Sequence, residues 1–215
     1  MCAIDSGWGR SSGEILAYLN SDDTYLPGAL GSAVQHLHEH PDAAAVCGGE
    51  LVIDRDGWVL STRGPESATF HDLLQFRFIP QPAVFLRRAA LEAAGGLDTA
   101  FPLVFDFELW TRLVHQGEIR CVPEVFATTR WYPETKTLSQ RPMVIAGLER
   151  VMEKALASPE GQQLTQADLR LSRARLGYTA TDVYMDSAGT HGRALLFSIL
   201  SVLKNWPPLL PDLMR

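Results

Sequence analysis

Residues 13–30, GEILAYLNSDDTYLPGAL, contain an apolar run that is followed by two adjacent acids, Asp22 and Asp23. The run EILAYL, residues 14–19, has the length of a buried strand. A helical pattern begins near Pro27 and ends before Pro41, because proline opens helices readily and does not continue them. The apolar residues at helical spacing in this pattern are Leu30, Ala33, Val34 and Leu37.

The two adjacent carboxylates are the first candidate functional feature. Like charges repel, so a site that keeps both acids ionised usually supplies a counter-charge. Open α/β sheets bind ligands at the carboxyl ends of their strands, and Mg²⁺ and Mn²⁺ prefer oxygen ligands. Successive side chains of an extended segment point to opposite sides, which predicts different roles for Asp22 and Asp23. The alternative is that both acids cap the helix near Pro27, since aspartate is a favoured N-cap residue.

The composition limits the class of protein. The 215 residues are enough for one domain, or one domain with a helical appendage, and 46% hydrophobic with 20% charged residues is typical of globular proteins. A formal charge of -6 argues against nucleic acid as a partner, because no basic excess exists to neutralise phosphates. Three widely separated cysteines, Cys2, Cys47 and Cys121, predict free thiols in a reducing cytoplasm.

The remaining patterns predict an α/β region over residues 1–140 and a helical extension over residues 141–215. Residues 43–62 indicate a hairpin, 69–76 a short helix, 81–88 a strand that leads into a helix, and 105–117 an amphipathic helix. Residues 118–122 and 124–130 indicate two further strands. The longest apolar stretch, ALLFSILSVL at 194–203, is about half as long as a membrane span.

Four segments together resemble family 2 glycosyltransferases. They are GEILAYLNSDDTYLPGAL, IPQPAVFLRRAALEAAGGLDTAF, FDFELWTRL and TTRWYPETKTLS, and they follow the family order between residue 3 and about residue 140. The resemblance implies a partial GT-A (Rossmann-like) domain that transfers a sugar from a nucleotide-sugar to a glycan, lipid-linked or other hydroxyl acceptor. It also implies a divalent metal, Mn²⁺ or Mg²⁺, and inversion at the anomeric carbon.

The resemblance assigns the central roles to three acids. Asp23 matches the residue that coordinates the metal at the diphosphate, and Asp22 would lie beside the ribose or a metal-bound water. Asp106 matches the general base, placed where the positive end of a helix dipole favours a carboxylate. The alternative for Asp106 is an N-cap. Glu108 is a weaker candidate for the base.

Four further residues match segments around the substrate. Arg130 and Lys136 match a loop that closes over the diphosphate, or else they belong to a solvated surface loop. Gln81 would lie near the acceptor or have a structural role. Trp110 would pack the helix onto the sheet or line the acceptor site, and packing is favoured. Tyr132 stands where the family usually has a histidine, and tyrosine cannot carry a positive charge at neutral pH.

In the family, one or two βαβ units precede the segment with the paired acids, and only some twenty residues precede Asp22 here. We therefore expect a glycosyltransferase that lacks its N-terminal nucleotide-binding strands, with strand 14–19 at an edge of the sheet. Such a chain is expected to be poorly soluble or oligomeric and to have weak affinity for nucleotides. A non-catalytic binding or scaffold module is the main alternative. A phosphatase-like reading of Asp22–Thr24 lacks the required nucleophile, and residues His36, His38 and His40 lack a third zinc ligand. A homo-oligomer and peripheral contact with the inner face of a membrane stay open.

Overall fold

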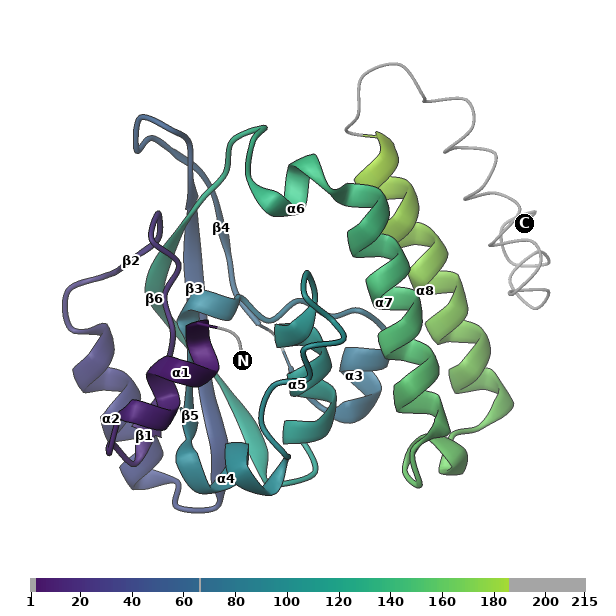
Figure 1. The fold of residues 1–215 in the computed structure, drawn as a ribbon, viewed down its shortest axis with the longest axis horizontal. Coiled ribbons are helices and arrows are strands. Elements are labelled where there is room, and N and C mark those ends of the chain that lie inside the picture. The colour runs from purple at the N-terminus through teal and green to yellow at the C-terminus, as the bar shows by residue number, and fades with distance from the viewer. Residues whose placement is uncertain (1–2, 66, 186–215) are drawn as a thin grey trace, which may run out of the picture. The chain divides into compact units, whose positions relative to one another are not determined.

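The computed structural model describes residues 3–65 and 67–185. Within these residues the fold is mixed α/β, with one sheet and helices on its faces, so the predicted class is confirmed (Figure 1). The chain divides into two compact units. The first holds residues 1–73 and 77–139, and the second holds residues 74–76 and the chain from residue 140 onward.

The elements have the following bounds. The strands are β1 (Ile15–Leu16), β2 (Thr24–Tyr25), β3 (Ala43–Ile53), β4 (Val59–Arg63), β5 (Val84–Arg87) and β6 (Glu118–Arg130). The α-helices are α1 (Ala3–Arg10), α2 (Ala29–Glu39), α3 (Phe70–Leu74), α4 (Arg88–Ala93), α5 (Phe105–Leu113), α6 (Lys136–Ser139), α7 (Arg141–Ala157) and α8 (Gln166–Met185). Short 3-10 helices are η1 (Gln81–Ala83) and η2 (Gly161–Gln163).

The sheet is built around one parallel pair. Strands β3 and β6 run parallel, and the sheet order is β1-β5-β3-β6-β2, with β4 paired to β3 as a hairpin. The other pairs are antiparallel. Ile53 and Arg130, the last residues of β3 and β6, are register partners. The carboxyl ends of the two central strands therefore lie together.

Apolar side chains form two cores, one on each face of the sheet. Figure 1 shows α2 on one side of the sheet and α5 on the other. The α5 side contains Trp8, Leu16, Leu86, Leu109, Trp110 and Leu113 among its buried residues. The α2 side contains Ala33, Leu37, Val46, Phe85 and Phe126. The core on the α2 side leaves no room for a side chain at position 48, because a Cβ atom on Gly48 would lie 2.5 Å from the Phe126 ring.

Several elements differ from the sequence-based expectations, among them β1, β6 and α2. The expected strand 14–19 has only two paired residues, because β1 has a single neighbour, β5, among the described residues; it does lie at the end of the sheet order. The two strands expected over 118–130 are one strand, β6, whose register shifts around Pro123 because proline has no N–H to donate. In α2 the buried positions are Ala29, Ala33 and Leu37, whereas Leu30 and Val34 are exposed.

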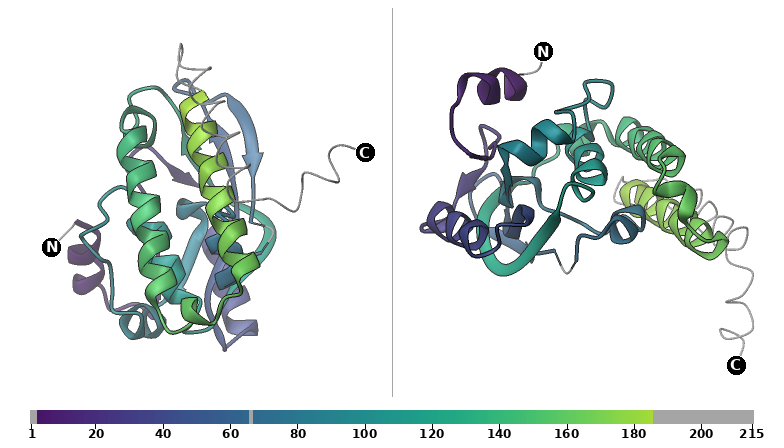
Figure 2. Two further views of the ribbon diagram at one scale, coloured as in Figure 1. Left: turned by 90° about the vertical axis from the view of Figure 1, so that its right-hand side faces the viewer. Right: turned by 90° about the horizontal axis from the view of Figure 1, so that it is seen from below.

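The second unit consists mainly of two helices. α7 and α8 lie side by side, as both views in Figure 2 show, and they are joined through η2. In the described part of the chain, no helix combines the length and the apolar character that crossing a membrane requires. The apolar stretch 194–203 and Cys2 lie outside the described residues.

Candidate functional site at the carboxyl ends of β3 and β6

Asp23 is a buried acid at the carboxyl end of the parallel pair. Asp23 is the residue immediately before β2, and β2 pairs with β6. One carboxylate oxygen accepts a hydrogen bond from the Arg130 backbone N–H at 2.9 Å, and the other accepts one from the Asn20 amide at 2.9 Å. Only 7% of Asp23 is exposed. Burial raises its pKa, although the hydrogen bonds from Arg130 and Asn20 oppose that effect.

Asp22 faces different partners, as the alternation of an extended segment predicts. Its carboxylate accepts a hydrogen bond from the Tyr132 hydroxyl at 3.2 Å. The negative charge of Asp22 raises the pKa of Tyr132, first through this hydrogen bond. Tyr132 is therefore a neutral donor to one of the two acids.

Neither Asp22 nor Asp23 caps a helix. The N-cap of α2 is Gly28, with φ of 85° and no side-chain cap, so glycine supplies the left-handed conformation there. Because β2 pairs with β6, Asp23 lies at the carboxyl ends of β3 and β6. Its hydrogen bond with Arg130 joins residues that are more than a hundred positions apart in the sequence. The helix-capping alternative for these acids is wrong.

Arg130 connects the acids to the β3–β4 turn. Its guanidinium donates to the carbonyl oxygens of Asp54 and Arg55 at 2.8 and 2.7 Å, and to the carbonyl of Asp22 at 3.3 Å. These contacts hold the strand ends together. Lys136, which the sequence placed in the same loop, is exposed at the start of α6.

Gln81 links the acids to the segment between β1 and β2. Its amide nitrogen donates to the Tyr18 carbonyl at 2.9 Å, and its amide oxygen accepts from Asn20 at 3.1 Å. We call Asn20, Asp22, Asp23, Gln81, Arg130 and Tyr132 the carboxyl-end cluster. Sequence reasoning missed Asn20, although it lies in the NSDD segment.

The first turn of α5 lies next to this cluster. The rings of Phe105 and Tyr18 have centroids 5.7 Å apart, so the helix start contacts the residue that holds Gln81. Contacts therefore run from Asp23 through Asn20, Gln81 and Tyr18 to the residue before Asp106.

Asp106 is half-buried in the first turn of α5. Its carboxylate accepts a hydrogen bond from the Phe107 N–H at 2.8 Å. Burial raises its pKa above that of an ordinary aspartate, against the opposing effect of the Phe107 hydrogen bond. A raised pKa makes the ionised carboxylate a stronger base. The N-cap of α5 is Val104, so Asp106 is not the N-cap.

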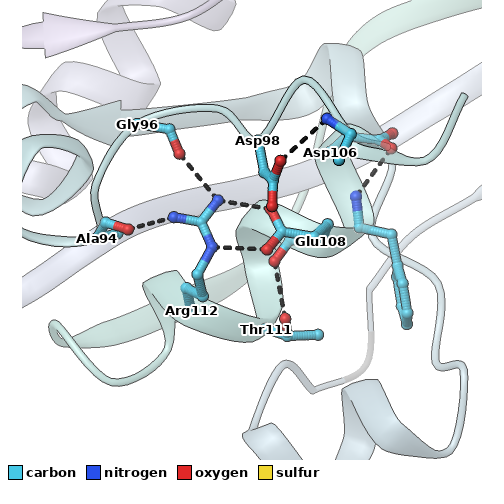
Figure 3. A network of polar contacts seen from close by, with 9 residues as sticks. Ala94, Gly96, Asp98, Asp106, Glu108, Thr111 and Arg112 are labelled. Carbon is cyan, nitrogen blue, oxygen red and sulfur yellow. Dashed lines mark hydrogen bonds and ion pairs between the residues drawn. The ribbon is translucent and has the colours of Figure 1, made fainter. Parts of the chain in front are cut away.

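Glu108 and Arg112 form a buried ion pair in the same helix. Two hydrogen bonds of 2.8 and 2.6 Å join them, and Arg112 also donates to the carbonyls of Ala94 and Gly96 (Figure 3). The Glu108 carboxylate is therefore engaged in structure. Trp110 is 1% exposed within the apolar core, which is the packing role that the sequence favoured and leaves no surface for an acceptor.

Glu50 is a second buried acid near the cluster, and the sequence reading did not identify it. It is 2% exposed, its carboxylate accepts a hydrogen bond from the Thr129 hydroxyl, and burial raises its pKa. The Asp23 charge raises this pKa further, so the two acids interact. A glutamate within the apolar strand AAAVCGGELVI was the available signal, since glutamate is rarely buried.

The raised pKa of Glu50 predicts a pH-dependent stability. The folded state binds the Glu50 proton more tightly than the unfolded state, so its contribution is present below about pH 4.5 and is lost as pH rises through the folded-state pKa. We expect Glu50→Gln, which can still accept from Thr129, to become more stable relative to the wild type as pH rises. Urea denaturation from pH 4 to pH 8 measures the difference, and a difference that is constant with pH would contradict the prediction.

The donor chemistry of Asp22 and Asp23 suits a divalent cation. Mg²⁺ is commonly held by one or two carboxylates together with substrate phosphates, and a carboxylate oxygen that accepts one hydrogen bond retains a further lone pair. Within residues 3–65 and 67–185, no three or more His, Cys, Asp or Glu side chains are grouped to hold a metal by themselves.

Comparisons with known proteins give a likeness among solved structures. No family model matches it, and no curated protein matches it. Among solved structures, S. aureus TarS aligns with a TM-score of 0.44 and 11% identity over 94% of this chain. The chain spans 40% of the length of that protein. A likeness of this size carries no argument about function.

Proposed function

We propose that the chain is a glycosyltransferase of the family 2 type, or the part of one that holds the metal and the general base. The observation that carries this proposal is the convergence of the four resembling segments. Four separate stretches of sequence contribute Asn20 with Asp23, Gln81, Phe105 at the start of α5, and Arg130. Asn20 contacts Asp23 and Gln81 directly, Arg130 contacts Asp23 directly, and Tyr18 connects Gln81 to Phe105. Chance matches of short motifs would have no reason to meet.

The roles follow from the chemistry of the side chains. Asp23 is proposed to face a divalent cation at the nucleotide-sugar diphosphate, with Asp22 beside the ribose or a metal-bound water. The cation would stabilise the charge that develops on the leaving nucleoside diphosphate. Asp106 would accept the proton of the acceptor hydroxyl as that oxygen attacks the anomeric carbon from the opposite face, which inverts the configuration. Arg130 fixes the strand ends through three carbonyls, so its proposed role is to position the acids rather than to bind phosphate directly.

Metal-dependent nucleotide binding tests the proposal. We expect the wild type to bind at least one of UDP, GDP and dTDP in the presence of Mn²⁺, and Asp23→Asn to weaken that binding more than about tenfold, because even outer-shell partners of a metal change affinity by 10–100-fold. Isothermal titration calorimetry with and without Mn²⁺ measures both affinities.

Asp42→Asn is the matched control. This exposed acid lies immediately before the amino end of β3, which is the end of the strand away from the site. It should bind the nucleotide like the wild type. Equal affinity with and without Mn²⁺, or unchanged affinity in Asp23→Asn, would remove the metal role. Absence of nucleotide binding by the wild type would favour a binding or scaffold module.

A further inference from the structure

Arg63 is a half-buried cation. Its guanidinium donates no hydrogen bond to an acceptor in residues 3–65 and 67–185. Two aromatic rings hold it instead: its guanidinium carbon lies 4.2 Å from the centre of the Trp131 ring and 5.7 Å from that of Phe78. Other arginines of the first unit use their donors. Arg130, Arg112, Arg87 and Arg88 each donate to backbone carbonyls, and Arg55, Arg77 and Arg120 pair with acids.

The surroundings of Arg63 belong to the candidate site. Trp131 directly follows β6, and its backbone N–H donates to the carbonyl of Ile53 at the end of β3. Phe78 lies three residues before Gln81, in the segment that reaches Asn20, and is 47% exposed. We call Arg63, Trp131 and Phe78 the arginine sandwich.

The buried Glu50 does not neutralise this cation by contact. Glu50 is the cross-strand neighbour of Arg63, and the Arg63 charge lowers the pKa of Glu50, but the ion pairs among the described residues do not include this pair. The Glu50 carboxylate faces Thr129 instead. Aromatic faces stabilise a guanidinium and fix its plane while leaving its N–H edge available, and that edge matches the two oxygens of a carboxylate or phosphate.

We propose that the arginine sandwich is a subsite for an anionic group, carboxylate or phosphate, carried by the sugar acceptor. The assignment to the acceptor rests on the proposed function. Strand β4 is separated from β2 by β3 and β6, which amounts to three strand spacings or about 14 Å. Asp22 and Asp23 precede β2, so the backbone of Arg63 lies on the other side of β3 and β6 from a diphosphate held there. An acidic acceptor that extends across the carboxyl ends of β6 and β3 would meet the arginine sandwich.

Matched disaccharides test this subsite. Cellobiose, cellobiouronic acid and cellobiose 6′-phosphate differ in charge and in its chemical source, and NMR titration of the ¹⁵N-labelled chain measures their affinities. We expect the wild type to bind at least one acidic sugar tenfold or more tightly than cellobiose, with the Arg63 Nε–H signal shifting. Which acidic sugar shows the preference identifies carboxylate or phosphate as the group. Arg63→Gln should abolish the preference, and Arg63→Lys should retain part of it because charge remains without the planar fork.

Arg120→Gln is the control, because Arg120 pairs with Glu118 near the start of β6, at the end of the strand opposite to the site, and should be dispensable for the preference. Equal affinities for neutral and acidic sugars in the wild type, a preference that survives Arg63→Gln, or no sugar binding at all would each overturn the subsite. Binding of UDP with Mn²⁺ should be unchanged by Arg63→Gln. Loss of UDP binding in the wild type with the acidic preference intact would defeat the proposed function but not the anion subsite.

Discussion

Replacing Arg112 by methionine will lower the free energy of unfolding by about 3–5 kcal/mol, the usual result of removing one partner of a buried ion pair. Glu108 is fully buried, whereas the Arg112 side chain is 24% exposed, so the glutamate is the partner that would be left uncompensated. The same substitution leaves the carbonyls of Ala94 and Gly96 without their donor. Urea denaturation followed by circular dichroism measures the change.

The double variant Glu108→Leu/Arg112→Met separates the charge from the packing. A buried pair replaced by apolar residues is often neutral, so we expect the double variant to recover much of the lost stability. Arg120→Met is the control, because its pair with Glu118 is solvated and should change stability by less than about 1 kcal/mol. A double variant no more stable than Arg112→Met would show that the contacts to the carbonyls, and not the buried charge, dominate.

Local patterns predicted the helices and the hairpin well, because their signals are local. The amphipathic helix expected over residues 105–117 is α5, the helix expected after the strand at 81–88 is α4, and the hairpin expected over residues 43–62 is formed by β3 and β4. The length of β1 did not follow, because strand pairing depends on neighbours that a local pattern does not show. The buried face of α2 was also displaced, since Ala29 rather than Leu30 faces the sheet.

The sequence singled out five of the six residues of the carboxyl-end cluster, but not the contacts that join them. The sequence placed the two acids at the end of their own strand, whereas the structure brings them to the end of β6 through β2. That contact joins Asp23 to Arg130 across more than a hundred residues, and no local pattern encodes it. Glu50 was missed for a related reason, because its burial depends on packing in the sheet.

Asp106→Asn will reduce the rate of sugar transfer by about 10²–10⁴-fold while leaving nucleotide affinity unchanged, if Asp106 is the general base. The change keeps the size of the side chain and an oxygen that can accept from the Phe107 N–H, so the first turn of α5 should keep its structure. It also removes a carboxyl group whose charged form is disfavoured by burial, and stability should not fall. The measurement is kcat for transfer from whichever nucleotide-sugar the binding experiment identifies.

The pH dependence of the wild type supplies an independent check. A general base must be ionised, so kcat/KM should fall as pH decreases through the pKa of Asp106, and burial places that pKa above the ordinary 3.8. Asp106→Asn should lack this acidic limb in its residual activity. A variant that keeps most of the wild-type rate and the same limb would assign proton removal to another group. Since Glu108 is committed to Arg112, that group would have to come from outside α5 or from the acceptor itself.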